Sequence, residues 1–330
     1  MKNVLVTGCA GLIGSHLSTH LLDNGFSVVG IDDLSGGYED WLPKHQNFSF
    51  HRQNLVQTGD LDNVFRDTRF DAVFHLAAYA AEGLSPFIRV HNYQNNVIAS
   101  ANVINKCIEH ECKLIFTSSM AVYGDQATPF VETQPCKPVD PYGNAKAAVE
   151  NDIKMAFDQF GLRYSIIRPH NVIGTNQNIW DRYRNVLGIF IRRTIAGQAM
   201  QVYGDGEQKR AFSDIQFFLP VFQKLIDNFD REIFNIGSDN YLTINQLAEI
   251  VAQQSIAFGL KPRIEHMEPR IEVSNAFCNH DKAKTLLGFH DQTSIEETTR
   301  TMIKWAMTQP ERTIKNMNYE ITKGIYSYWV

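Results

Sequence analysis

A tyrosine and a lysine four positions apart, Tyr142 and Lys146, have the types and spacing needed for acid–base chemistry. On a helix this spacing places both side chains on one face, about one turn apart. A free tyrosine has a pKa of about 10 and is a poor base near neutral pH, but a nearby cation favours the phenolate. Tyr142 could then accept a proton from a sugar or alcohol hydroxyl. The alternative is an ordinary solvent-facing pair on an amphipathic helix.

Two serines, Ser118 and Ser119, lie at the end of a predicted strand over residues 113–118. In open α/β sheets, ligands bind outside the carboxyl ends of the strands. These hydroxyl groups therefore favour a catalytic role for Tyr142 and Lys146, which begin a long helix predicted over residues 142–160.

Three glycines at three-residue spacing, Gly8, Gly11 and Gly14, stand between an apolar run over residues 4–6 and the start of a helical period. The first glycine permits a tight turn, the second lets the backbone approach a pyrophosphate, and the third lets helix pack on strand. The pyrophosphate would lie on the free N–H groups at the start of the helix. Glycine triplets also occur in ordinary loops, so the flanking strand and helix are what predict a dinucleotide site.

An acidic pair, Asp32 and Asp33, ends a second predicted strand over residues 27–31. A carboxylate at this place hydrogen-bonds the adenosine ribose hydroxyls of NAD and repels a 2′-phosphate. The pair could also simply begin a turn, because Leu-Ser-Gly-Gly follows it. We assign Asp32 to the ribose and predict NAD as the cofactor.

Two further stretches are expected at the same edge of the sheet. Asn54 and Leu55 lie in the loop after the third predicted strand, where they could meet adenine. Ala77 and Ala78 follow the fourth predicted strand, and their small side chains would let backbone come close to a flat ligand.

The composition excludes several classes of protein. With 330 residues, 44% of them hydrophobic and 20% charged, the chain resembles an ordinary globular protein with a large core. A net charge of −5 offers no basic face for nucleic acid, and no apolar stretch is long enough to span a membrane. The five cysteines lack metal-ligand spacing, and His75 and His170 lack a third ligand, so we expect no metal site. We expect a reduced, cytoplasmic protein without a signal peptide, since Thr7-Gly8 breaks the first apolar run.

Strands that alternate with helices up to Pro169 predict an α/β fold with a Rossmann-type, doubly wound parallel sheet. From His170 onward the helices are interrupted, and a strand near residues 233–235 is expected to return to the sheet. We therefore predict an NAD-binding Rossmann domain made of residues 1–169 and 214–237. Residues 170–213 and 238–330 would form a smaller, mixed α/β substrate-binding domain.

Ten motifs spread over residues 1 to about 290 together carry a family resemblance. They are Thr7-Gly8-x-x-Gly11-x-x-Gly14, His75-Leu-Ala-Ala78, Asn95-Asn96-Val97, Ser118-Ser119-Met-Ala-Val-Tyr-Gly124, Tyr142-x-x-x-Lys146, Arg168-Pro-His-Asn171, Asn185-Val186, Gly204-Asp-Gly206, Arg210-Ala-Phe212 and Pro269-Arg270. With them the chain resembles the extended short-chain dehydrogenase/reductase family, in its nucleotide-sugar epimerase and dehydratase branch. Within that branch it looks most like the UDP-galactose 4-epimerases.

The resemblance implies a role for individual residues. Ser119 would hydrogen-bond the reacting sugar hydroxyl, Tyr142 would be the acid/base, and Lys146 would also hold the nicotinamide ribose. The implied cofactor contacts are Gly8, Gly11, Leu12, Ile13, Gly14, Asp32, Asp33, Asn54, Leu55, Leu76, Ala77, Ala78, Asn96, Ser118, Tyr142, Lys146 and Pro169. The implied substrate contacts are Glu82, Ser119, Met120, Asn171, Asn185, Val186, Val202, Tyr203, Arg210, Arg270 and Ala276. Arginines and asparagines suit a diphosphate and a ribose, although either arginine could also be a solvated surface residue.

The activity implied by the resemblance is a 4-epimerase of a UDP-hexose or UDP-N-acetylhexosamine, with a transient 4-keto sugar. One rival is a dehydratase that uses Glu82 as an extra acid/base. The favoured role for Glu82 is instead to cap the helix predicted over residues 86–110. The other rival is a non-catalytic, NAD-binding regulatory protein, which the intact Ser119, Tyr142 and Lys146 disfavour.

Two finer expectations follow from the same resemblance. Counting back from Lys282-Ala283 places Ala276 beside the sugar's 2-position, where a methyl group leaves room for an N-acetyl group. With a register one residue different, Phe277 would fill that space instead. The helices predicted over residues 86–110 and 142–160 would pair with a second subunit to form a homodimer.

Overall fold

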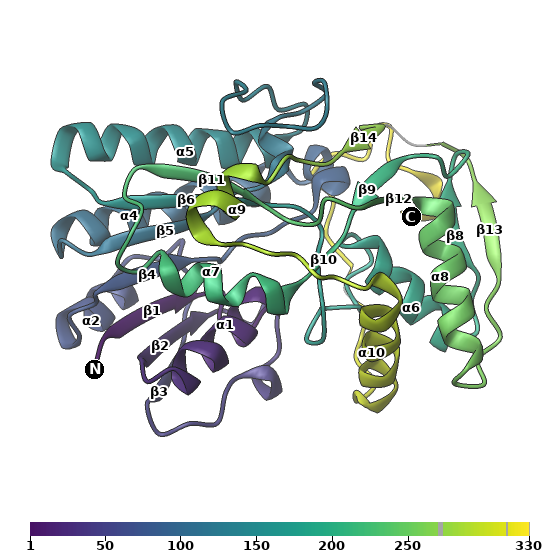
Figure 1. Cartoon of the computed structure of the whole chain (residues 1–330), viewed down its shortest axis with the longest axis horizontal. Helices are drawn as coiled ribbons and strands as arrows, with labels where there is room; N and C mark the ends of the chain where they lie inside the picture. The colour runs from purple at the N-terminus through teal and green to yellow at the C-terminus, as the bar shows by residue number, and fades with distance from the viewer. Residues whose placement is uncertain (270–272, 315, 330) are drawn as a thin grey trace.

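The computed structural model describes residues 1–269, 273–314 and 316–329. At its centre is a seven-stranded parallel sheet in the order β11-β6-β5-β4-β1-β2-β3 (Figure 1). Its strands are β1 (Asn3–Thr7), β2 (Ser27–Asp32), β3 (Phe48–Arg52), β4 (Ala72–His75), β5 (Lys113–Thr117), β6 (Tyr164–Pro169) and β11 (Glu232–Ile236). This is the doubly wound strand order with β11 added at one edge, so the predicted Rossmann-type sheet is confirmed.

Helices cover both faces of the sheet, because its strands carry apolar side chains on both sides (Figure 1). In β1, Val4 and Val6 join the apolar cluster on one face and Leu5 joins the cluster on the other, and all three are fully buried. The helices of the first face are α1 (Leu12–Asp23), α7 (Leu219–Lys224) and α9 (Asp281–Leu287). Those of the second face are α2 (Gly59–Asp67), α4 (Ala99–Glu109) and α5 (Pro141–Phe160).

The single long helix predicted over residues 86–110 is divided into four pieces. They are a 3₁₀ helix (Glu82–Phe87), α3 (Arg89–Tyr93), a π-helical segment (Gln94–Ile98) and α4. Ile88, with φ of −135°, is not helical and therefore separates the first piece from α3. None of the helices in the described ranges is long and apolar enough to cross a membrane.

The second part of the chain forms small sheets and three helices next to the carboxyl ends of the large sheet (Figure 1). The strands pair as β7 (Val172–Ile173) with β10 (Ser213–Asp214), β8 (Met200–Tyr203) with β13 (Ile264–Met267), and β9 (Lys209–Ala211) with both β12 (Tyr241–Thr243) and β14 (Asn275–Ala276). The helices are α6 (Val186–Ile195), α8 (Ile244–Ile256) and α10 (Ile295–Thr308), which share an apolar cluster of their own. The division into two domains stays a prediction. Helix α9, in the segment assigned to the second domain, packs on the large sheet through Ala283 and Leu287.

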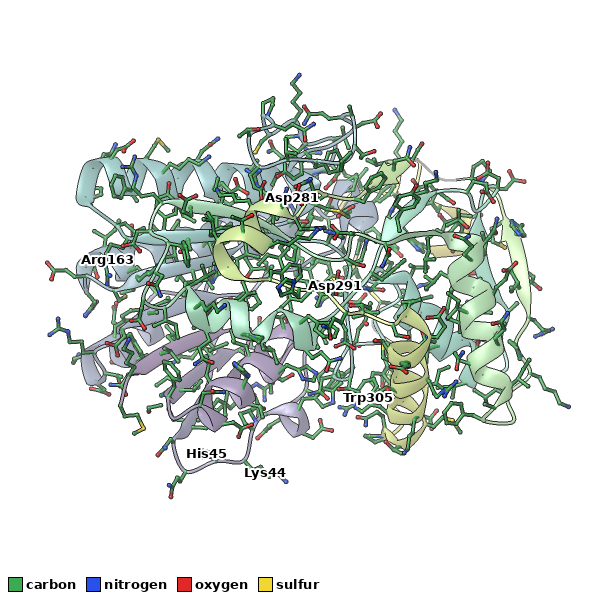
Figure 2. The ribbon with its side chains drawn as sticks, in the orientation of Figure 1. Lys44, His45, Arg163, Asp281, Asp291 and Trp305 are labelled. Atoms are coloured by element: carbon green, nitrogen blue, oxygen red, sulfur yellow. The ribbon has the colours of Figure 1, made fainter. Side chains whose placement is uncertain are left out.

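Trp305 of α10, labelled in Figure 2, connects the two parts of the chain. Its ring centroid lies 5.8 Å from that of Trp41 and 6.4 Å from that of Trp180. Trp41 ends a 3₁₀ helix (Glu39–Trp41) that follows β2. The loop after β2 is therefore held against α10.

A buried ion pair ties α5 to the sheet. Nη2 of Arg168, in β6, lies 2.5 Å from Oε2 of Glu150, in α5, and the two side chains are 2% and 0% exposed. Ser118 Oγ donates to Glu150 Oε1 at 2.5 Å, and Arg168 Nη1 donates to the Tyr123 hydroxyl at 2.8 Å. Because Lys146 lies one turn before Glu150, this network also fixes which face of α5 meets the sheet.

Glu150→Gln should destabilise the protein strongly, because it leaves the Arg168 charge buried without a counter-ion. Breaking a buried pair in this way costs about 3–5 kcal/mol of unfolding free energy, which chemical denaturation would measure. The double variant Glu150→Gln/Arg168→Met removes both charges and should recover most of the loss. A single variant as stable as the wild type would contradict the role given to the pair.

Candidate active site

A cleft of about 1270 Å³ runs along the carboxyl edge of the large sheet and is lined by both parts of the chain. Its volume exceeds the roughly 300–1,000 Å³ of a site for one drug-sized ligand. Most of the predicted site residues line it: Gly8, Gly11, Leu12, Ile13, Gly14, Asp32, Asp33, Asn54, Leu55, Leu76, Ala77, Ala78, Glu82, Ser118, Ser119, Tyr142, Lys146, Pro169, Asn171, Asn185, Val186, Tyr203 and Arg210. The structure thus brings these residues into one place.

The glycine turn has the geometry that a dinucleotide site requires. Gly8 has a φ of +71°, and a Cβ there would lie 2.8 Å from the amide nitrogen of Ala77. A Cβ on Gly14 would lie 2.1 Å from the carbonyl oxygen of Gly8, so helix and strand pack at a distance only glycine allows. Gly11 begins α1 without a side-chain cap, which leaves the first N–H groups of the helix for an anion. These features fit the pyrophosphate of NAD.

Thr7, which sequence reasoning did not single out, joins the two strand ends beneath this turn. Its Oγ1 accepts hydrogen bonds from the amides of Leu76 and Ala77, both at 3.2 Å. The same oxygen lies 2.8 Å from Nδ1 of the buried His75. A threonine before the glycines was part of the motif quoted above, but only the three-dimensional structure shows its partners.

Asp32 both closes the turn and lines the cleft. Its Oδ2 accepts from the amide of Ala10 at 3.0 Å, and its Oδ1 accepts from the amide of Leu34 at 2.8 Å. Burial raises the pKa of Asp32, and these two N–H groups oppose the rise. Asp33 accepts from the amide of Ser35 at 2.8 Å, so the acidic pair does begin a turn. Contact between Asp32 and a ribose stays a prediction.

Tyr142 and Lys146 are buried, so the solvent-facing interpretation of the pair is wrong. They are 6% and 3% exposed, near Ser119, which is 8% exposed. Asp140 places the start of α5 by accepting from the amide of Gly143 at 2.9 Å. Lys146 Nζ donates to the carbonyl oxygen of Thr117 at 2.8 Å and lies 5.9 Å from the centre of the Tyr142 ring.

The pKa of Tyr142 differs from the sequence-based expectation. Burial raises it well above its usual value, the Glu82 carboxylate raises it further, and a hydrogen bond with Ser119 opposes these effects. Burial lowers the pKa of Lys146 to about 7, against the attraction of Glu150. The phenol is therefore protonated in the protein alone, because the effect of burial exceeds that of the neighbouring charges.

Glu82 lies at the cleft. It is an exposed residue in the first turn of the 3₁₀ helix, which has no side-chain cap. The start of α3 is instead capped by Glu320, whose carboxylate accepts from the amides of Val90 and His91 at 2.7 and 2.8 Å. The first N–H groups of α3 are thus bonded by Glu320, and the negative charge of Glu82 acts on Tyr142. A capping role for Glu82 stays a prediction.

The polar residues expected to bind substrate are held by the backbone of the second part of the chain. Asn185 Oδ1 accepts from the amide of Leu187 at 3.1 Å and so caps α6. Asn171 Nδ2 donates to the carbonyl oxygen of Ala211 at 2.9 Å, and Arg210 Nη2 donates to that of Val273 at 2.6 Å. Arg270 lies outside the described residues.

Four predicted contact residues are not among the described residues that line the cleft: Asn96, Met120, Val202 and Ala276. Asn96 uses its amide group on the backbone of Tyr79, accepting at 3.1 Å and donating at 3.2 Å, so it positions a cleft residue instead. Val202 points into the apolar cluster because side chains alternate along β8, which leaves Tyr203 facing the cleft. Met120 and Ala276 are buried in a common apolar cluster.

Phe277, the alternative to Ala276, does not line the cleft either. Its ring stacks on that of Tyr241 with centroids 4.7 Å apart. Residues Asn275 and Ala276 pair with β9, and of this segment Ala276 is buried whereas Phe277 is half-buried against the exposed Tyr241. The structure therefore gives no support to a sugar contact at either position.

A wall of the cleft that the sequence motifs did not indicate comes from residues 316–329. Tyr326, Tyr328 and Trp329 line the cleft, and Trp329 packs in a cluster with Tyr183 and Phe87. These aromatic residues therefore pack together and also face the site. The composition of this stretch was its only signal in the sequence.

His170 does have neighbours of ligand type, contrary to the sequence analysis: Cys278 and His280 lie within 4.8 Å. Nε2 of His170 is 2.8 Å from Nε2 of His280, whose Nδ1 is 2.8 Å from Oδ1 of Asp239. Two imidazole nitrogens on one tetrahedral zinc, each at about 2.0–2.1 Å, would stand about 3.3 Å apart. The shorter distance is that of a hydrogen bond, so this group is a hydrogen-bonded chain from His170 to Asp239.

Comparison with known proteins agrees with this site. The model of the NAD dependent epimerase/dehydratase family matches residues 4–237, and the chain therefore belongs to that family. A putative UDP-glucose 4-epimerase of Methanocaldococcus jannaschii is 29% identical over 306 residues, 92% of this chain and 97% of the relative.

Two solved structures have closely similar folds. One is the UDP-glucose 4-epimerase of Thermotoga maritima with UDP-glucose, at a TM-score of 0.87 and 30% identity, covering 92% of this chain and 98% of that one. The other is the UDP-N-acetylglucosamine 4-epimerase of Methanobrevibacter ruminantium with UDP-N-acetylmuramic acid, at a TM-score of 0.86 and 30% identity, covering 94% and 99%. The family is NAD dependent, so the predicted cofactor NAD is confirmed.

The protein should bind NAD more tightly than NADP, by roughly tenfold or more, because the Asp32 carboxylate repels a 2′-phosphate. Fluorescence titration with both cofactors would measure the preference. Asp32→Ala should reduce the ratio of NAD affinity to NADP affinity. Asp33→Ala, which removes a neighbouring carboxylate bonded within the turn, should leave that ratio unchanged. Equal affinity of the wild type for the two cofactors would remove Asp32 from this role.

Proposed function

We propose that the protein is a UDP-sugar 4-epimerase that acts on a UDP-hexose or UDP-N-acetylhexosamine. The observation that carries the proposal is the convergence of Ser119, Tyr142 and Lys146 beside the glycine turn, in one cleft. The two 4-epimerases of similar fold support it, since each acts on a sugar of one of these classes by its name.

The side chains suit a reaction that oxidises and then reduces one carbon of the sugar. When bound, NAD supplies the reversible redox chemistry at C4. In the protein alone the Tyr142 phenol is protonated, and the positive charge of the oxidised nicotinamide would favour its phenolate once NAD is bound. The phenolate would then take the proton of the 4-hydroxyl group and later return it to the same oxygen, while the Ser119 hydroxyl orients that oxygen. Between the two steps the 4-keto sugar presents its other face. No atom is lost, so substrate and product have the same mass.

Lys146 supports Tyr142 by position more than by a fixed charge. Its bond to the Thr117 carbonyl oxygen holds Nζ at the end of β5, near the tyrosine ring. With a pKa of about 7, it is partly protonated near neutral pH and donates to the ligands it reaches. Arg210 and Asn185, further along the cleft, would bind the diphosphate and ribose. The same role stays a prediction for Arg270.

A dehydratase would need a further acid/base group beside the sugar. Glu82 is the residue predicted above for that role, and it does line the cleft. Met120 and Ala121, which follow Ser119, carry no group that moves a proton. The acid/base set therefore favours epimerisation, which needs only Tyr142.

We also propose that the protein is a cytoplasmic homodimer. All five cysteines are free thiols, which suits a reducing compartment. Helices α4 and α5 lie side by side (Figure 1). Val90 of α3, Ile98 of the π-helical segment and Met155 of α5 are 60%, 48% and 51% exposed. A four-helix contact with a second copy would bury these side chains, and light scattering of Met155→Glu against the wild type would test it.

Tyr142→Phe keeps the ring and the start of α5 but removes the proton acceptor. Turnover of UDP-glucose or UDP-N-acetylglucosamine should fall by about 10²–10⁴-fold, the usual contribution of a general acid/base. Stability and NAD affinity should change little, since the phenyl ring still fills the buried site. Near-normal turnover would show that another group moves the proton.

The product should be the 4-epimer, with no loss of water or carbon dioxide. Incubation with a panel of UDP-sugars, followed by NMR and mass spectrometry, would identify it and the preferred sugar. A product lighter by one water would instead establish the dehydratase. Glu82→Gln should then abolish that loss, whereas it should leave an epimerase active.

A further inference from the structure

Arg184 is a cleft residue to which neither the motifs nor the proposed reaction gives a role. It immediately precedes Asn185, the residue that caps α6, so it belongs to the second part of the chain. Its Nε lies 3.0 Å from Oδ2 of Asp181, whose side chain is fully buried. Its guanidinium carbon lies 4.7 Å from the centre of the Tyr79 ring. These contacts hold the guanidinium in a fixed place.

That place is next to the loop that follows β2. A Cβ on Gly36 would lie 3.0 Å from Nη2 of Arg184 and 3.1 Å from its Nη1. The neighbouring Gly37 packs directly against the glycine turn. A Cβ added at Gly37 would lie 2.0 Å from the carbonyl oxygen of Ala10 and 2.8 Å from the amide nitrogen of Gly11. Only the two small residues Gly36 and Gly37 therefore connect the guanidinium to the glycine turn.

The loop is fixed at this point by a second residue from the same part of the chain. Asn178 Nδ2 donates to the carbonyl oxygen of Gly36 at 3.0 Å. A Cβ at Gly36 would be in tight contact with the guanidinium and would push it away by a few tenths of an ångström. The glycine is thus what lets Arg184 come close to the turn.

The charge of Arg184 reaches both ends of the cofactor site. Burial raises the pKa of Asp32, at the adenosine end, and that of Tyr142, beside the catalytic serine, and the charge of Arg184 weakly opposes both rises. The guanidinium itself lies beside Gly36, and the next residue, Gly37, contacts the glycine turn where the pyrophosphate would lie. The pyrophosphate is the part of NAD that lies between its two riboses, and it carries the negative charge of the cofactor.

We propose that Arg184 binds the pyrophosphate of NAD, opposite the N–H groups of the glycine turn. A guanidinium offers paired donors whose geometry matches phosphate oxygens, and it keeps its charge at any working pH. The first part of the chain would hold the cofactor through its backbone and the second part through this side chain. NAD would then join the two parts, whichever sugar the protein takes.

The test compares ligands that contain or lack the diphosphate. In Arg184→Met, the affinities for NAD and ADP-ribose should fall by roughly 10–100-fold, the range of a hydrogen bond to a charged group. The affinity for adenosine should stay within about twofold of the wild type. Arg193→Met is the matched control, because it removes a cleft arginine that is bonded to the carbonyl oxygen of Ala199; it should leave all three affinities unchanged.

A second measurement is the amount of NAD that stays with the protein through gel filtration, determined after denaturation. Arg184→Met should retain much less than Arg193→Met, and Arg184→Lys, which keeps the charge but not the paired donors, should lie between. An equal loss of adenosine and ADP-ribose affinity would mean that Arg184 only supports Tyr79 and Asp181, and would overturn the proposal. Unchanged ADP-ribose affinity would overturn it as well. If Arg184→Met does not fold, Arg184→Lys and Arg184→Gln take its place. For each variant the loss of ADP-ribose affinity is then compared with the loss of adenosine affinity.

Discussion

The ion pair between Glu150 and Arg168 is the contact on which the catalytic geometry depends. Burying two charges is costly, and here both are bonded to further groups, Ser118 and Tyr123, so that neither is left unsatisfied. Glu150 lies on the same face of α5 as Tyr142 and Lys146, and Ser118 precedes Ser119. A single network in the core therefore sets the rotation of the helix and the end of β5, where the reacting groups meet.

The features that could be predicted from the sequence are those that depend on short stretches of chain. Gly8 has a positive φ and Gly14 allows close packing of helix on strand. The run Val4, Leu5 and Val6 is apolar on both faces of the sheet. Each of these features can be predicted from a few consecutive residues. The predicted sheet and most of the cofactor edge followed from them.

Residues whose role depends on distant partners could not be predicted in this way. Asn96 was expected at the cofactor, but within a π-helical segment it bonds the backbone of Tyr79. Ala276 was expected at the sugar, but strand pairing turns it into the core. Arg184 belongs to no motif, and its place depends on Asp181, Tyr79 and Gly36, two of which are far away in the sequence. The pKa of Tyr142 also differs from the expectation, since burial raises it. The spacing of two residues on a helix does not show whether their side chains are exposed to solvent.

The wall formed by residues 316–329 has a consequence for biosynthesis. Its Glu320 bonds the start of α3 across 230 positions of the chain, whereas β1 to β6 all come from the first 169 residues. Domains fold during translation as their sequence emerges, N-terminal parts first. The ribosome must therefore produce nearly the whole chain before the cleft has all its walls. Until then the carboxyl edge of the nascent sheet is open, so a ligand that binds early would remain exposed to solvent on the side of the missing wall.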